Sequence, residues 1–301
     1  MALLNTLRFL REHPLTSRQP ARAFARYVRW QIGSRLALGA TAVRFVNDAR
    51  LLVQPGMTGA TGNVYAGLHE FVDMAFTLHV LRKDDLFADV GANVGAYTVL
   101  AAHVVGARVL AFEPAPAARA ALLDNIRLNG IGDRVDVRAA CVGSGSGAVR
   151  ITTEHDTTNH VVLDGAESDR HASATVEVPL TSLDIALAAR VPLLMKLDIE
   201  GYELEALRGA RATLENAALC AIIMECNSTG LRYDRSHFEL EQQLLGRGFR
   251  RYDYLPFERR LVELIDTDGL REGNAIFVRD VERVSERLRS APAFEVLGER
   301  V

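Results

Sequence analysis

The residues best able to do chemistry in this 301-residue chain are acids that end apolar stretches. In "LFADVGANVGAYT" the apolar part ends at Asp89, and a glycine-rich turn from Gly91 to Gly95 leads into a helical pattern. Glu113 ends the next apolar stretch, "RVLAFE", 22 positions after Gly91. An acid at this distance from a glycine turn accepts hydrogen bonds from the hydroxyls of a bound ribose. The pair therefore predicts a site for a nucleoside-containing ligand.

The composition of the turn indicates the charge of that ligand. A dinucleotide pyrophosphate needs G-x-G-x-x-G, but from Gly91 the chain reads G-A-N-V-G-A, so Asn93 replaces the second glycine. An anion would also be repelled by Asp89. The same acid suits S-adenosylmethionine, whose amino group and sulfonium are positive. The turn therefore favours S-adenosylmethionine over a nicotinamide dinucleotide.

A second set of charged residues lies in "KLDIEGYE", at the end of a later apolar stretch. Alternate residues of a strand share one face, so Lys196, Asp198 and Glu200 can all point toward the ligand cleft. Asp198 is the first choice for the group beside the reacting atoms. Glu200 either joins it or caps the following helix, and Lys196 either binds an acceptor oxygen or keeps Asp198 ionised. Glu225 and Asn274 are secondary candidates for the cleft wall.

A polar stretch at residues 151–178 interrupts the strand pattern and is predicted to lie on the substrate side. An unperturbed histidine titrates near neutrality, which suits a general base. His160 is favoured because it is followed by the apolar pair Val161 and Val162, which could anchor it. The stretch also offers His155, Asp156 and Asn159.

The elements that must position these residues follow a repeating order from Leu86 onward. Short apolar stretches alternate with helical patterns, and the last two stretches, in "FRRYDYLPFERRLVELI" and "GNAIFVRD", follow one another without a helix. Continuous apolar strands indicate burial on both faces of a parallel sheet. The pattern predicts an α/β, doubly wound sheet with its ligand at the carboxyl ends of the strands.

The first part of the chain differs in composition. Residues 1–60 are predicted to form a helical appendage to a domain at 61–301, packing through Phe24, Tyr27 and Trp30, and the glycine-rich stretch after Val53 is predicted to be a loop. Residues 1–50 contain nine arginines and two acids. We expect this appendage to cover the cleft, to join a second copy in a homo-oligomer, or to meet an anionic surface such as a membrane.

The bulk composition narrows the class of protein. Apolar residues make up 49% and charged residues 24%, as in ordinary globular proteins, and the net charge of −3 argues against nucleic acid as a partner. The three cysteines form no C-x-x-C pair and no zinc pattern, so we expect reduced thiols and no metal. No leader and no bilayer-spanning run is recognisable, which predicts a cytoplasmic protein.

In these motifs the chain resembles the FkbM family of S-adenosylmethionine-dependent methyltransferases, from about Gly67 to Val278. The resemblance rests on "GLHEF", "DVGANVGAYT", "FEPAPAARAALLDNIRLN", "KLDIEGYE", "LRGA" and "GNAIF", in the family's order. It implies a class I methyltransferase (Rossmann-like) fold of seven strands with the last one antiparallel. It also implies methyl transfer, usually to a hydroxyl of a sugar, glycan or secondary metabolite.

The resemblance also assigns residues to the cofactor. It implies that the glycine turn surrounds the methionine part, that Glu113 binds the ribose and that Glu70, in "GLHEF", faces the amino group. Asp198 is expected to touch both cofactor and acceptor. The full expected cofactor set is Glu70, Asp89, Gly91, Asn93, Gly95, Thr98, Glu113 and Asp198, and the expected catalytic set is Asp198, His160, Lys196 and Glu200.

The predicted function is therefore O-methylation of a small molecule or glycan with a free hydroxyl. A nicotinamide-dependent oxidoreductase is the first alternative, disfavoured by Asn93 and by the lack of a Tyr-x-x-x-Lys pair. An inactive cofactor-binding adaptor is the second, disfavoured by the intact Lys196, Asp198 and Glu200 set.

Overall fold

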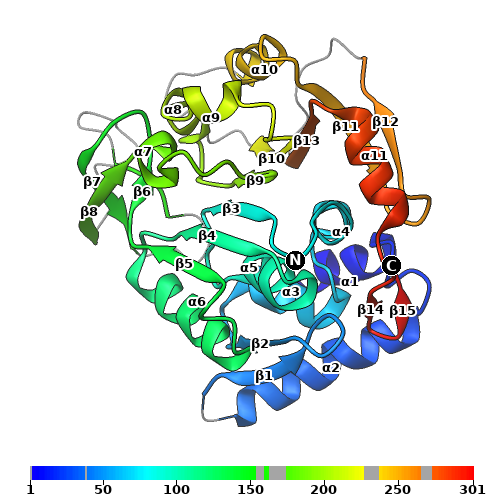
Figure 1. Cartoon of the computed structure of the whole chain (residues 1–301). Coiled ribbons are helices and arrows are strands. Elements are labelled where there is room, and N and C mark those ends of the chain that lie inside the picture. The colour runs from blue at the N-terminus through cyan, green and yellow to red at the C-terminus, as the bar shows by residue number, and fades with distance from the viewer. Residues whose placement is uncertain (1, 38, 154–158, 163–173, 227–236, 266–272) are drawn as a thin grey trace.

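The computed structural model describes residues 2–37, 39–153, 159–162, 174–226, 237–265 and 273–301. Its centre is an eight-stranded sheet in the order β12-β11-β13-β10-β9-β3-β4-β5 (Figure 1). Neighbours from β10 to β5 run parallel, whereas β13 is antiparallel to both β10 and β11. The strands are β3 (Leu86–Val90), β4 (Arg108–Phe112), β5 (Val135–Arg138), β9 (Leu194–Leu197), β10 (Ala221–Cys226), β11 (Arg250–Leu255), β12 (Arg260–Glu263) and β13 (Gly273–Val278).

This order confirms the predicted class I methyltransferase fold with its antiparallel last strand. The sheet has one strand more than expected, because "FRRYDYLPFERRLVELI" folds back on itself. Within that segment β12 pairs antiparallel with β11, and Tyr254 lies opposite Leu261. The extra strand forms the edge of the sheet beyond β11, far from the parallel strands that carry the candidate site.

Side chains from the parallel strands fill two separate cores, as continuous apolar strands require. Along β4, Val109 and Ala111 join one core, and Leu110 and Phe112 join the other. The first core is covered by α4 (Phe71–Val80), α5 (Ala96–Val99), the π-helical turn η1 (Leu100–Val105), α6 (Pro116–Leu128) and α11 (Val281–Ser290). The second is covered by α7 (Leu183–Leu187), α8 (Glu203–Arg208), α9 (Arg211–Glu215) and α10 (His237–Leu245). Figure 1 shows α7 to α10 on one side of the sheet and α4, α5 and α6 on the other, so the sheet is doubly wound.

The predicted substrate-side stretch contributes to a small second sheet. It consists of β6 (Cys141–Val142), β7 (Gly147–Thr152) and β8 (Thr175–Thr181), in the order β6-β8-β7. Val161 forms an isolated bridge with Ile151 of β7, and both side chains are buried. Residues 159–162 are therefore held against β7.

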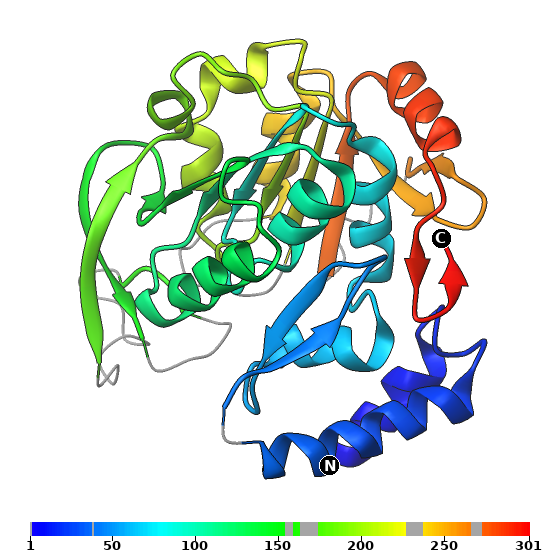
Figure 2. The ribbon, with the colours of Figure 1, turned by 60° about the horizontal axis from the view of Figure 1, so that its bottom comes forward.

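The N-terminal residues form α1 (Ala2–Glu12), α2 (Pro20–Leu36), the hairpin of β1 (Thr41–Arg44) and β2 (Arg50–Val53), and α3 (Thr58–Ala66). Figure 2 shows α1 and α2 below the hairpin, away from the central sheet. Trp30 is buried as predicted, and the Tyr27 ring contacts Tyr65 with centroids 5.3 Å apart. The prediction for Phe24 is wrong, because its side chain is 50% exposed. The glycine-rich stretch predicted as a loop contains α3, which packs on α2 and β2.

The hairpin joins this segment to the main core. The side chain of Asn125 on α6 accepts a hydrogen bond from the backbone N–H of Leu52 at 2.7 Å, and that of Asn129, the residue after α6, accepts one from Arg50 at 2.9 Å. Val46 also forms a bridge with Val296 of the C-terminal hairpin, β14 (Glu295–Val296) and β15 (Glu299–Arg300). Residues on both sides of position 60 thus share one core.

No helix in the described ranges is long and apolar enough to cross a bilayer.

Candidate active site

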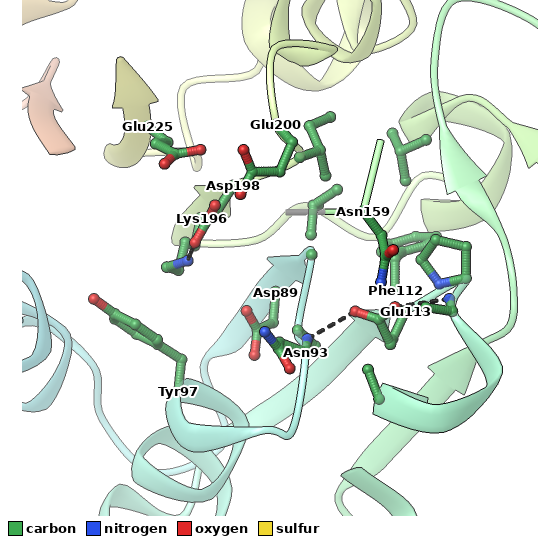
Figure 3. Close-up of a pocket in the computed structure, with 18 of the residues that line it drawn as sticks. Asp89, Asn93, Tyr97, Phe112, Glu113, Asn159, Lys196, Asp198, Glu200 and Glu225 are labelled. Atoms are coloured by element: carbon green, nitrogen blue, oxygen red, sulfur yellow. Dashed lines mark hydrogen bonds and ion pairs between the residues drawn. The ribbon is translucent and has the colours of Figure 1, made fainter. Parts of the chain in front are cut away.

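A pocket of about 400 Å³ opens at the carboxyl ends of β3, β4, β9 and β10 (Figure 3). Strands that run parallel end at the same edge of the sheet, so residues far apart in the sequence meet there. The pocket is lined by most of the predicted site residues: Glu70, Asp89, Gly91, Asn93, Glu113, His160, Lys196, Asp198, Glu200 and the secondary candidate Glu225.

Asp89 lies at the end of β3 and is almost completely buried. Its Oδ2 accepts a hydrogen bond from the Thr98 hydroxyl at 2.6 Å, whereas its Oδ1 is buried and has no hydrogen-bond partner among the described residues. Burial raises the pKa of Asp89, while the nearby Lys196 ammonium opposes the rise. A buried oxygen without a partner is unfavourable, so Oδ1 is suited to a positively charged hydrogen-bond donor in the pocket.

Gly91 is required by the packing of β3 against β9. Its φ is +85°, and a Cβ placed there would lie 1.8 Å from the backbone oxygen of Asp198. Any side chain would therefore push the end of β9, with Asp198, out of place. The sequence predicted that Gly91 lets the backbone approach a ligand closely. In the structure, the absence of a side chain at Gly91 lets the backbone of Asp198, at the end of β9, pack against it.

Gly95 and Thr98 do not line the pocket; they support the residues that do. Gly95 has a φ of +89° and starts α5, and a Cβ there would lie 2.4 Å from Cδ1 of Leu122. Thr98 is fully buried and holds Asp89 through its hydroxyl.

Glu113 follows β4 and is 6% exposed. Its Oε2 accepts a hydrogen bond from the backbone N–H of Asn93, and its Oε1 accepts one from that of Ala115, both at 2.8 Å. Burial raises the pKa of Glu113 to about 7, although these two bonds lower it. Each carboxylate oxygen can accept a second hydrogen bond, so the side chain is fixed in place and can still bind a pair of hydroxyls.

Glu70 is tied to three other residues around the pocket. Its Oε2 accepts a hydrogen bond from the Tyr97 hydroxyl at 2.8 Å, and its Oε1 accepts one from the Asn274 amide at 3.1 Å. The same amide donates to Oδ2 of Asp73 at 3.0 Å. Burial, and then the charge of Glu70, raise the pKa of Asp73 to about 7. Asn274 acts here by holding two acids together.

Lys196 and Asp198 form an ion pair of 2.5 Å, and both residues line the pocket. Lys196 is 3% exposed, and its Nζ lies 4.7 Å from the centre of the Tyr97 ring. Burial lowers the pKa of Lys196, but Asp198, Glu70 and Asp89 together raise it above its usual value. Burial likewise raises the pKa of Asp198, but Lys196 more than compensates, so Asp198 stays ionised. Of the two predicted roles, this geometry fits the one in which Lys196 keeps Asp198 ionised.

Glu225, at the end of β10, completes a group of acids with Asp198 and Glu200. One carboxylate oxygen from each lies within 4.8 Å of the other two. Burial and the charges of Asp198 and Glu200 raise the pKa of Glu225 to about 9, so at neutral pH it carries a proton and donates a hydrogen bond to Asp198. Three carboxylates at this spacing can share a proton or coordinate a divalent cation.

Glu200 does not cap the helix that follows it. Glu203, the first residue of α8, instead holds the loop before that helix, since its Oε1 accepts hydrogen bonds from the backbone N–H groups of Ile199 and Gly201, each at 3.1 Å. Glu200 has a φ of +56° and its side chain lines the pocket with Asp198. The loop held by Glu203 therefore directs Glu200 toward the cleft.

A family model described as Methyltransferase FkbM domain matches residues 89–251, which is more than half of the chain. The chain belongs to this family. The FkbM assignment makes it a methyltransferase with S-adenosylmethionine as its cofactor, and it removes the nicotinamide alternative. No curated protein sequence matches the chain.

Several solved structures resemble the FkbM chain at low sequence identity. TYW2 from P. horikoshii, in complex with MeSAdo, has 14% identity and a TM-score of 0.41, over 80% of this chain and 70% of that one. Precorrin 8W decarboxylase from Methanobacterium thermoautotrophicum has 18% identity and a TM-score of 0.37, over 70% and 89%. An rRNA methylase from Streptococcus thermophilus has 15% identity and a TM-score of 0.37, over 69% and 93%.

The polar stretch at residues 151–178 of the FkbM chain, predicted to lie on the substrate side, reaches the pocket through Ile151, Asn159, His160 and Val161. Figure 3 shows Asn159 beside Glu113, across the pocket from Lys196 and Asp198. The neighbouring His160 is buried, and its backbone N–H donates to the Thr152 hydroxyl at 3.1 Å. His160 also lines the pocket. It comes directly after Asn159 in the sequence, and Asn159 lies beside Glu113. His155 and Asp156 lie outside the described residues.

Sequence reasoning missed Tyr97, which donates a hydrogen bond to Glu70, and Asp73, which shares the Asn274 amide with Glu70. Tyr97 follows Gly95 by two positions and Asp73 follows Glu70 by three, but neither spacing indicates a shared site. The N-terminal helix was also not predicted to reach the loop before α4. The Phe9 ring lies 5.2 Å from that of His69, and Nε2 of His13 lies 2.7 Å from the backbone oxygen of Leu68.

Proposed function

We propose that this FkbM methyltransferase transfers a methyl group to a hydroxyl of a sugar, glycan or secondary metabolite. The observation that supports this most is the ionised carboxylate of Asp198 in the pocket. Its carboxylate is kept ionised by the buried Lys196 and is 29% exposed at the pocket mouth, at the end of β9. An ionised carboxylate there can accept a hydrogen bond from an acceptor hydroxyl and orient its oxygen.

The residues around the pocket fit the cofactor. When bound, S-adenosylmethionine supplies an electrophilic methyl group on a sulfonium. We propose that Glu113 binds the ribose hydroxyls, because its oxygens keep free lone pairs. Glu70 and Oδ1 of Asp89, which is buried with no partner in the described part of the chain, would face the positive end. Positioning of the two reactants can supply roughly 7–11 kcal/mol of the barrier reduction.

The proton of the acceptor needs no strong base in this scheme. As the hydroxyl oxygen bonded to the methyl carbon, the methyl–sulfur bond would break and its electron pair would leave on the sulfur as a neutral thioether. The oxygen would become positively charged, which makes its proton strongly acidic. The O–H bond then breaks, its electron pair stays on the oxygen, and the proton passes to Asp198. Asp198 can accept it despite a pKa below its usual value. Asp198 would thus both orient the hydroxyl and take its proton while the bond to the methyl group forms, and Glu225 holds Asp198 in place by donating to it.

The charges of the wall favour a neutral acceptor. Among the described residues that line the pocket, Lys196 is the one lysine beside the acids Glu70, Asp89, Asp198 and Glu200. A phosphorylated or carboxylated acceptor would be repelled, whereas the hydroxyls of a polyol can donate hydrogen bonds to carboxylates. We also propose that the protein is cytoplasmic, which is consistent with its three buried free cysteines. The proposed acceptor is a small molecule or a glycan and not a nucleic acid.

The test is a screen of neutral sugars, glycans and hydroxylated metabolites with methyl-labelled S-adenosylmethionine. We expect a labelled methyl ether as the product, and no transfer to phosphorylated forms of the same acceptor. Label on nitrogen or carbon would contradict O-methylation. Cofactor binding without any transfer, across acceptors found to bind, would instead support the inactive adaptor.

A further inference from the structure

One face of α2 carries large apolar side chains in solvent. Phe24, Ile32 and Leu36 are 50%, 59% and 78% exposed, and the half-buried Val28 completes their four-residue spacing. Residues spaced by four lie along one side of a helix. The opposite side of α2 is fixed inward, because Trp30 is buried. Figure 2 shows α2 at the outer edge of the molecule.

Arginines flank this apolar stripe on both sides. Arg22 and Arg29 lie on one side and Arg35 on the other, and all three are exposed. Arg22 donates to the Gln19 side chain and Arg35 to the backbone oxygen of Gln31, but none of the three forms an ion pair within the described residues. The sequence has no acid between Glu12 and Asp48. The face is therefore both apolar and uniformly positive.

Three kinds of partner could cover such a face, and two fit it poorly. A second copy docking with the same face would bring arginines against arginines. A nucleic acid would pair with the arginines and leave Phe24, Ile32 and Leu36 in water. A membrane with anionic lipids satisfies both features, since the apolar side chains enter the headgroup boundary and the arginines meet lipid phosphates.

We propose that the face of α2 formed by Phe24, Val28, Ile32 and Leu36, with Arg22, Arg29 and Arg35, docks onto an anionic phospholipid surface. The helix lies in the plane of the interface, since it does not cross the bilayer. This inference is independent of the proposed acceptor, because it uses no residue of the pocket.

The test measures co-sedimentation of the full chain at low salt, where charge attraction is strongest. Vesicles of phosphatidylcholine with phosphatidylglycerol are compared with vesicles of phosphatidylcholine alone. We expect binding to the first and little to the second. Each arginine near such a surface is worth about fivefold in partitioning, so Arg22→Glu with Arg29→Glu should weaken binding by at least about 25-fold. Arg211→Glu with Arg289→Glu, both exposed elsewhere, makes the same change in net charge and should leave most of the binding intact.

A second variant, Ile32→Ser with Leu36→Ser, tests the apolar part and should also release the protein from the vesicles. Unchanged S-adenosylmethionine binding in each variant controls for folding. The proposal is overturned if the anionic vesicles bind nothing, or if both charge variants lose binding equally. It is also overturned if Ile32→Ser dissociates a dimer of a chain that ignores vesicles, or if only nucleic acid is bound through Arg22 and Arg29.

Discussion

Replacing Asp198 with asparagine removes one negative charge from the mouth of β9 and leaves the shape of the side chain nearly unchanged. The asparagine oxygen can still accept hydrogen bonds from Lys196 and from the protonated Glu225. A hydrogen bond to a charged acceptor contributes about 1.5–3 kcal/mol, against about 0.5–1.5 kcal/mol for a neutral one. The variant should therefore hold the acceptor hydroxyl more weakly and should accept its proton poorly.

These two losses set the expected magnitude. Loss of the proton-accepting group should decrease kcat by about 10²-fold or more. A 10²-fold decrease corresponds to about 2.7 kcal/mol of activation free energy. We expect Asp198→Asn to lower kcat by at least about 10²-fold. The affinity for S-adenosylmethionine should stay nearly unchanged, because Asp89, Glu70 and Glu113 remain. The free energy of unfolding should fall by about 1–3 kcal/mol, since the buried Lys196 loses its closest counter-charge.

The assay combines calorimetric titration of S-adenosylmethionine with turnover on the acceptor found in the screen. Asp253→Asn, the same chemical change at an exposed position of β11, is the matched control and should match the unmodified enzyme. A folded Asp198→Asn enzyme with near-normal kcat would refute the reasoning. The chemistry would then have to lie with another group, such as His160.

Further predictions concern cofactor, protons and metal. Glu113→Ala should weaken S-adenosylmethionine binding at least about tenfold in calorimetry, because a bond to a charged acceptor is lost. His160→Ala should raise KM if His160 holds the acceptor, or lower kcat if it is the base. The raised pKa of Glu225, about 9, means that the folded state keeps a proton that the unfolded chain has lost above about pH 4.5. Stability should therefore fall as pH rises from about 5 to about 9, by up to about 1.4 kcal/mol per pH unit, and Glu225→Gln should flatten this dependence in urea unfolding. EDTA should leave methyl transfer unchanged.

Clear outcomes would contradict each of these. Unchanged affinity in folded Glu113→Ala would move the ribose site elsewhere. No change of kcat or KM in His160→Ala would remove it from the site. An equally steep pH dependence in Glu225→Gln would place the retained proton on another acid, such as Glu113. Activity lost in EDTA and restored by magnesium would make Asp198, Glu200 and Glu225 metal ligands.

Local patterns in the sequence determined the framework of this protein. Apolar stretches such as "LFADV" and "RVLAF" are buried on both faces, and helical patterns separate them, so a doubly wound parallel sheet follows. The edge where Asp89, Glu113 and Asp198 gather follows from the same rule, because parallel strands end together. The glycine turn and the ribose spacing could likewise be recognised, because they depend on residues close in sequence.

Only the tertiary structure decided how these groups act. Gly91 is needed because the backbone of Asp198, more than a hundred residues later, approaches it. Glu70 is fixed by Tyr97 and Asn274, which come from separate elements. The proton on Glu225 depends on burial and on the charges of Asp198 and Glu200, and α3 forms in a glycine-rich stretch because it packs on α2 and β2. Protonation, contact and helix formation of this kind depend on distances in space, and a one-dimensional pattern contains no such distances.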